Sequence, residues 1–210
     1  IDGTNPWEAD GKGSIGKVGL DGKVIAAQWV SGLNAPKGMG MLNGKLYVAD
    51  LTNIAVIDIA SGKIEKTIPL EGAVGLNDIS LDPKGVIYVT DSKAKKLYRV
   101  ENEKAELLAE NLTAPNGVLF HQDVLYLLDG TGMFKVNADN SLTLIADGME
   151  GGIDGIENIQ GNDFIISCWA GALWHVNTDG TKHLLMDTQA EKRSTADIGF
   201  DPETKTVYVP

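Results

Sequence analysis

The sequence is poor in cysteine, long apolar runs and basic residues. Its one cysteine, Cys168, excludes an internal disulfide. Because no run of about 18 apolar residues occurs, no transmembrane helix and no membrane insertion are expected. The 210 residues hold 18 Lys and Arg against 29 Asp and Glu, a net charge of −11. This acidic balance argues against nucleic acid and anionic membranes as partners and is compatible with cation binding.

A sustained helical period of apolar residues is also missing, so helix is expected to be scarce. What the chain has instead is a repeated turn that leads into a strand. Ala114-Pro115-Asn116-Gly117 precedes an apolar run at 118–120, and similar stretches precede residues 39, 79, 156 and 198. Aligning them gives one column with steps of 40, 39, 38 and 42 residues: Lys37, Asn77, Asn116, Asp154 and Ala196. A period near 40 in a strand-rich chain indicates a repeat architecture.

The repeat predicts an all-β fold, a β-propeller of four-stranded antiparallel blades. Residues 1–13 are expected to form a loop in which Trp7 is a packing anchor. Strands at 15–18 and 24–29, joined by a hairpin turn, give a half blade. Four complete units and a final half unit follow, so residues 1–210 are expected to be one propeller domain interrupted within blades at both ends. Six blades are the expected count if the natural chain is longer.

The blade geometry predicts two rings of residues at one end of the axis. Inner strands surround the axis, so the aligned column, from Lys37 to Ala196, forms the first ring. The second strand runs back to the same end, which gives a second ring of Asp50, Asp91, Asp129 and Trp169. Two amide oxygens and one carboxylate suit a hard divalent cation such as Ca²⁺ or Mg²⁺. The alternative is that these Asn and Asp residues are turn formers that bond their own backbone.

The other polar residues receive structural interpretations. The aspartates of the second ring are expected to satisfy N–H groups in the loop after the second strand, and Glu157 is expected to be a paired structural carboxylate. Cys168 is expected in the core. Lys37, Asp91, Asp129 and Trp169 remain weaker candidates for substrate contacts. The three histidines fall outside both rings: His121, His175 and His183.

At these residues the sequence resembles the gluconolactonase, senescence marker protein and luciferin-regenerating-enzyme family of six-bladed propellers. The resemblance covers about residues 35–209. It depends on Leu76-Asn77-Asp78, Leu81-Asp82-Pro83-Lys84-Gly85, Pro115-Asn116-Gly117 and Ile153-Asp154-Gly155. It implies that Asn77, Asn116 and Asp154 hold a divalent metal, with Ca²⁺ ahead of Mg²⁺ or Zn²⁺.

The sequence departs from that family at two points. The family's fourth ligand is a glutamate that opens the first inner strand, and one period before Lys37 lies before Ile1. Sugar-lactone members tend to place an arginine two residues before the first asparagine, where this chain has Gly75. The second departure argues against a sugar lactone as the substrate.

The leading functional hypothesis is a metal-dependent hydrolase that acts on a small-molecule lactone or a similar ester. Asp154, the one charged member of the Asn-Asn-Asp set, would orient the attacking water or accept its proton. The first alternative is a non-catalytic propeller that binds a small ligand or a protein partner, with any axial cation structural. The second is a lyase or synthase that uses other axial residues. A glutamate opening the first inner strand would favour the hydrolase.

Overall fold

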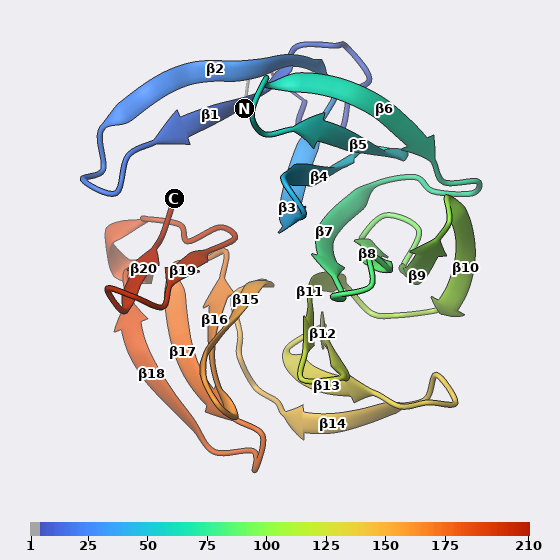
Figure 1. Cartoon of the computed structure of the whole chain (residues 1–210). Coiled ribbons are helices and arrows are strands. Elements are labelled where there is room, and N and C mark those ends of the chain that lie inside the picture. Colours follow the sequence, from blue (N-terminus) through green and yellow to red (C-terminus); the bar gives the residue numbers. More distant parts are fainter. Residues whose placement is uncertain (1–4) are drawn as a thin grey trace.

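The computed structural model describes residues 5–210 and is an all-β propeller (Figure 1). A two-stranded sheet comes first, formed by β1 (Gly13–Val18) and β2 (Val24–Leu33). Four four-stranded antiparallel sheets follow, each in sequence order from the axis outward. A second two-stranded sheet closes the order, formed by β19 (Gly199–Asp201) and β20 (Thr206–Tyr208). The prediction of four complete blades between two partial ones is therefore confirmed.

The four complete blades share one plan. The first comprises β3 (Pro36–Leu42), β4 (Lys45–Asp50), β5 (Asn53–Asp58) and β6 (Lys63–Pro69). The second comprises β7 (Leu76–Leu81), β8 (Ile87–Asp91), β9 (Lys96–Glu101) and β10 (Lys104–Ala109). The third comprises β11 (Pro115–His121), β12 (Val124–Asp129), β13 (Gly132–Val136) and β14 (Leu142–Ala146). The fourth comprises β15 (Ile153–Gln160), β16 (Asp163–Cys168), β17 (Ala172–Asn177) and β18 (Lys182–Asp187).

Helix is scarce, as the sequence predicts. Within residues 5–210 the helical content is one short 3₁₀ helix, Gln189–Glu191. In the same part of the chain, no helix has the length and apolar character needed to cross a membrane.

The core lies between neighbouring blades rather than inside any one of them. Phe164 and Ile166 of β16 pack with Leu128 and Met133 of the preceding blade, and all four side chains are essentially inaccessible to solvent. Strand residues alternate between two faces, so each blade can present one apolar face to the blade before it and one to the blade after. Full burial of a side chain of this kind stabilises the fold by roughly 1.5–3 kcal/mol. Packing between blades therefore fixes the positions of the inner strands.

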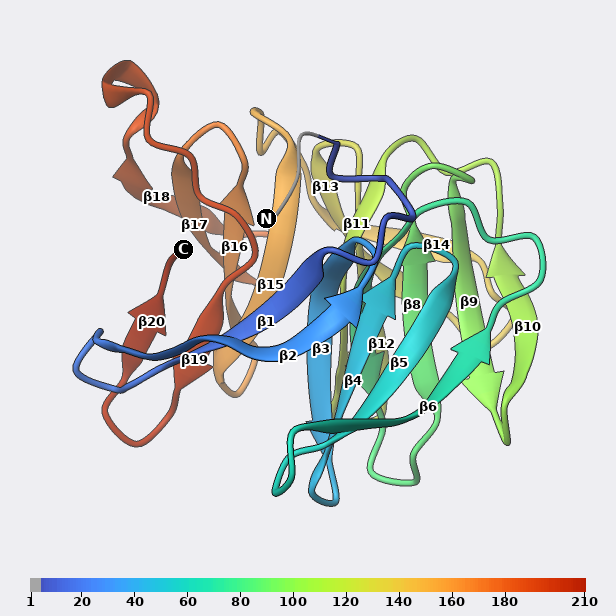
Figure 2. The same cartoon turned by 90° about the horizontal axis from the view of Figure 1, so that it is seen from above.

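The inner strands β3, β7, β11 and β15 surround the axis side by side (Figures 1 and 2). Glycines permit their close approach. A Cβ atom at Gly38 would lie 2.3 Å from the Asp78 Oδ1 atom, and one at Gly117 would lie 2.5 Å from the Asp154 carbonyl oxygen. Both glycines come one residue after a member of the first ring. The absence of a side chain there lets the ring residues gather at the ends of their strands.

Candidate functional site

All five residues of the first ring line one cavity where the inner strands begin. Its volume is about 750 Å³, within the range of sites that bind small molecules. Here it is called the axial cavity, and its ring residues are Lys37, Asn77, Asn116, Asp154 and Ala196. The 40-residue period therefore brings together, in one place, side chains that are up to 159 positions apart.

The second-ring aspartates do not line the axial cavity among the described residues. Instead, Asp50, Asp91 and Asp129 accept hydrogen bonds from backbone N–H groups, and we call them the aspartate clamps. Asp50 Oδ1 accepts from the N–H of Ala35 at 2.6 Å, and Asp129 Oδ1 accepts from the N–H of Ala114 at 2.6 Å. Their structural interpretation is right, and the N–H of Ala94 in the loop after β8 donates to Asp91 as expected, but most of their bonds go to a different loop. The clamps mainly hold the loop before the inner strand of their own blade, because each aspartate lies opposite the first residue of that strand.

The fourth blade has no aspartate clamp, and its second-ring position was predicted one residue too late. Strand β16 ends at Cys168, which pairs with Ile153 as Asp129 pairs with Pro115. Cys168 is fully buried in the core, as expected. Trp169 follows the strand, and its N–H donates to the carbonyl oxygen of Gly152 at 2.7 Å. Trp169 lines the axial cavity with 56% of its surface exposed, so it remains a candidate for ligand contact.

Several buried carboxylates lie near one another along the axis. Burial and the charge of Asp197 together raise the pKa of Asp154 to about 7, although a hydrogen bond with the Asn116 side chain partly opposes the rise. Burial and the charge of Asp197 likewise raise the pKa of Glu157 to about 7. Glu157 lines a second cavity of about 340 Å³, further along the inner strands, and Asp197 lines both cavities. The axial cavity therefore places its own carboxylate where negative charge is unfavourable unless a cation accompanies it.

Among the cavity residues that were not predicted as site residues, Trp7 and Asp197 are the ones with an aromatic or charged side chain. Trp7, expected to be a packing anchor, lines the axial cavity together with Pro6. Asp197 directly follows the ring residue Ala196, just as Asp78 directly follows the ring residue Asn77. That shared offset is a signal in the sequence that could have identified Asp197. No such signal exists for Trp7, because the N-terminal loop lies outside the repeat.

The ring lysine is engaged with this N-terminal loop. The Lys37 ammonium donates a hydrogen bond to the Pro6 carbonyl oxygen at 2.6 Å and lies 4.6 Å from the centre of the Trp7 ring. Burial lowers the pKa of Lys37, and the charge of Asp50 partly opposes this. Lys37 therefore brings a partly desolvated cation to the rim of the cavity.

The oxygen atoms of the ring fit a hard divalent cation. The Asn77 Nδ2 atom donates to the Ser92 Oγ atom at 2.8 Å, which leaves the amide oxygen as the atom available to a ligand. Within residues 5–210 no group of three or more His, Cys, Asp or Glu could hold a metal ion, so a cation would need the amide oxygens. Asn77, Asn116 and Asp154 offer oxygen donors of the type that Ca²⁺ and Mg²⁺ prefer.

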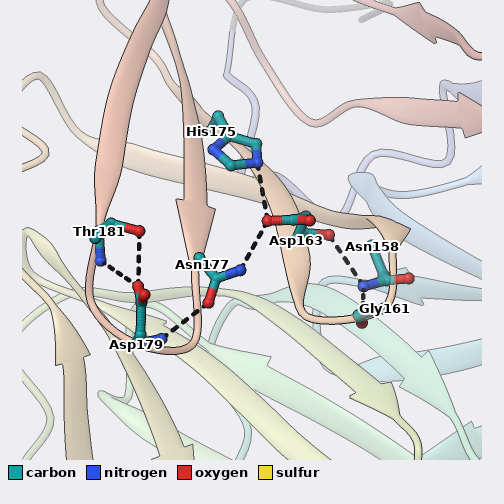
Figure 3. A network of polar contacts seen from close by, with 7 residues as sticks. All are labelled: Asn158, Gly161, Asp163, His175, Asn177, Asp179 and Thr181. Carbon is teal, nitrogen blue, oxygen red and sulfur yellow. Dashed lines mark hydrogen bonds and ion pairs between the residues drawn. The ribbon is translucent and has the colours of Figure 1, made fainter.

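The histidines lie away from the axial cavity. Figure 3 shows a polar network at the opposite end of the fourth blade, where Asp163 Oδ1 lies 3.1 Å from His175 Nε2 and accepts from Asn177 Nδ2 at 2.8 Å. Asn158 in the same network donates to the carbonyl oxygens of Gly161 and Asp163. The network fixes the β15–β16 and β17–β18 turns, which is a structural role.

Comparison with known proteins places this geometry among related propellers. A model of the SMP-30/gluconolactonase/LRE-like region matches residues 23–209. Comparison with curated proteins finds no significant match.

Similar solved structures include a gluconolactonase from Xanthomonas campestris, with 18% identity over 95% of this chain and 76% of that one and a TM-score of 0.77. A catalytically inactive virginiamycin B lyase from Staphylococcus aureus, crystallised with quinupristin, has 17% identity over 93% of this chain and 69% of that one, with a TM-score of 0.72. A chain of the nidogen/laminin complex has 20% identity over 93% of this chain and 74% of that one, with a TM-score of 0.66. At these identities the likenesses show a common fold and nothing finer.

Proposed function

The chain belongs to the SMP-30/gluconolactonase/LRE-like family, and we propose on that basis that it hydrolyses a small lactone or a related ester with a divalent cation at the axial cavity. One observation carries the proposal. Asn77, Asn116 and Asp154, which are far apart in the sequence, line a single cavity large enough for a small molecule. The ligand set is a proposal about these residues, with Ca²⁺ ahead of Mg²⁺ or Zn²⁺.

The three ligand residues divide the work between neutral and charged groups. Asn77 and Asn116 would bind the cation through neutral oxygens, and Asp154 would add the single negative charge. When bound, the cation supplies a Lewis acid that polarises the substrate carbonyl and lowers the pKa of a water. Its charge would also offset the unfavourable ionisation of Asp154 that burial and Asp197 impose.

Asp154 would act in the chemical step through a carboxylate oxygen. That oxygen accepts a proton from water as the water oxygen attacks the carbonyl carbon. The acyl–oxygen bond then breaks, and the proton passes to the departing alkoxide, which leaves a hydroxy acid from a lactone. Residues of the cavity wall would hold the substrate over the ring and exclude bulk water. General acid–base help of this kind typically contributes ~10²–10⁴-fold to the rate.

The proposal predicts separate effects on metal binding and on turnover. Calorimetry with Ca²⁺ should show binding that Asn116→Ala weakens by at least about tenfold, because one oxygen ligand is lost. The protein should hydrolyse a member of a panel of sugar and apolar lactones, and EDTA should abolish that activity. At saturating cation, Asp154→Asn should lower kcat by ~10²–10⁴-fold.

The matched control is Asp129→Asn, an aspartate outside the cavity that acts on the backbone. It should leave kcat nearly unchanged below its unfolding midpoint. Equal Ca²⁺ affinity in the parent and Asn116→Ala proteins would place any metal elsewhere. Metal binding that depends on the ring, without turnover across the panel, would replace hydrolysis by a binding role with a structural cation.

A further inference from the structure

We propose that Trp7 determines the substrate specificity of the axial cavity, and that it selects lactones or esters whose body is an apolar ring or chain. The inference depends on the proposed function, because it names the substrate class for that site. Its basis is that Trp7 lines the cavity and contacts three residues: Lys37, which also lines the cavity, and Gly75 and Lys93.

Gly75 provides the space that Trp7 occupies. A Cβ atom at Gly75 would lie 2.9 Å from the Cζ3 atom of the Trp7 indole and 2.4 Å from the Cγ atom of Lys93. The indole therefore lies directly against the backbone two residues before Asn77. A longer side chain at this position would displace it. Because residue 75 is a glycine, it offers no side chain to a ligand, and Trp7 provides the apolar wall next to it.

The loop that carries Trp7 is held by several specific contacts. The ammonium groups of Lys37 and Lys93 lie 4.6 and 4.9 Å from the centre of the indole ring. The Lys37 ammonium also donates to the Pro6 carbonyl oxygen, and the backbone N–H of Trp7 donates to Asn5 Oδ1 at 3.0 Å. Cations attract the face of an indole, so these contacts fix the position of the ring as well as that of the backbone. The indole of Trp7 is therefore held in a fixed position at the cavity.

The rest of the rim is consistent with an apolar ligand. Trp169 lines the same cavity with 56% of its surface exposed, and the largely buried Pro115 and Ile153 also line it. A hydroxyl that is buried against an indole loses its hydrogen bonds to water and gains none in return. A lactone rich in hydroxyl groups would therefore bind this wall poorly, whereas an apolar ring would gain by leaving water. The polar groups of the ring remain for the reacting carbonyl.

The test measures binding separately from turnover. The binding probes are two lactams of equal ring size, one fused to a benzene ring and one carrying several hydroxyl groups, titrated calorimetrically at saturating Ca²⁺. The parent protein should prefer the aromatic lactam. Trp7→Ala should weaken that lactam by about tenfold and leave the polyhydroxylated one unchanged. Trp7→Phe should restore most of the affinity, because an aromatic wall is retained.

Two further variants test the contact between the indole and Gly75, and whether the loss of affinity is specific to Trp7. Gly75→Ala should weaken the aromatic lactam several-fold, because the new methyl group displaces the ring. Trp29→Ala is the matched control, since Trp29 also faces a lysine, Lys17 at 3.9 Å, but does not line the cavity. It should change neither affinity.

The outcomes separate this inference from the proposed function. Equal affinity for the aromatic lactam in the parent and Trp7→Ala proteins, or a preference for the polyhydroxylated lactam, would overturn the role of Trp7 even in an active hydrolase. Binding of the aromatic lactam that depends on Trp7, without hydrolysis of the matching lactone, would overturn hydrolysis and keep Trp7 as the wall of the ligand site.

Discussion

Replacing the clamp residue Asp91 by alanine should destabilise the protein more than almost any other change of a single polar side chain. Asp91 is fully buried, and its carboxylate accepts three backbone hydrogen bonds. The donors are the N–H groups of Val74 at 2.7 Å, Gly75 at 3.0 Å and Ala94 at 2.6 Å. Asp91→Ala leaves all three N–H groups without an acceptor, and the N–H group of Gly75 is buried.

The size of the effect follows from the number and the burial of these bonds. A hydrogen bond to a charged group contributes roughly 1.5–3 kcal/mol, and a buried donor left unsatisfied costs about 1–3 kcal/mol. Because the three bonds share one carboxylate and two donors lie near the surface, their loss is less than additive. We expect Asp91→Ala to lower the free energy of unfolding by about 3–5 kcal/mol. Asp129→Ala, which frees two donors, should cost less.

Urea denaturation gives the loss of stability, and hydrogen exchange locates it. In Asp91→Ala the amide protons of Val74, Gly75 and Ala94 should lose protection first, while those of the fourth blade keep theirs. Asp179→Ala is the control, because Asp179 accepts from the backbone of an exposed turn at the opposite end of a blade. A loss below 1 kcal/mol for Asp91→Ala, or unchanged protection at Gly75, would refute the clamp as the element that fixes this loop.

Two other predictions follow from the inner strands. Gly117→Ala should cost about 1–3 kcal/mol of stability, because its Cβ atom would lie 2.5 Å from the Asp154 carbonyl oxygen and 2.7 Å from Leu128 Cδ1. Gly199→Ala meets no atom within 4 Å and is its control; equal thermal midpoints for the two would contradict the argument. The pKa of Glu157, raised by burial from 4.5 to about 7, favours the protonated folded state. Stability should therefore fall as pH rises from about 4.5 to 7, and Glu157→Gln should flatten this slope in urea titrations; an unchanged slope would exclude Glu157 as its source.

The repeat allowed the blades and the first ring to be predicted because both depend on period and direction alone. A residue that opens an inner strand must lie near the axis, whatever its side chain, and Lys37 satisfies this rule as well as Asn116 does. Ala196 lines the same cavity, although β19 begins only at Gly199. The same rule cannot define the limit of a strand to one residue. Cys168 and Trp169 both fit the end of a strand, and only the pairing of Cys168 with Ile153 decides between them.

The contacts of the N-terminal loop could not be predicted, because the loop has no register with the blades. The position of Trp7 depends on the shape that Gly75, Lys37 and Lys93 create together, and these residues come from two different blades. The direction of the clamps was missed for a similar reason. A terminal aspartate can serve the loop on either side of it, and the cross-strand pairing selects the loop before the inner strand.

The aspartate clamps have a consequence for how such a site can be redesigned. In three blades the entry loop is fixed by an aspartate that does not line the cavity, so the side chains of Asn77 and Asn116 are not needed to hold the entry loops of their blades. Lys37, Asn77 and Asn116 differ in charge and length, yet they open their strands in the same way. The ring position of each blade can therefore carry different side chains on the same backbone. A new donor set, such as a carboxylate in place of Asn77 or Asn116, should therefore be tolerated one blade at a time without a change of fold.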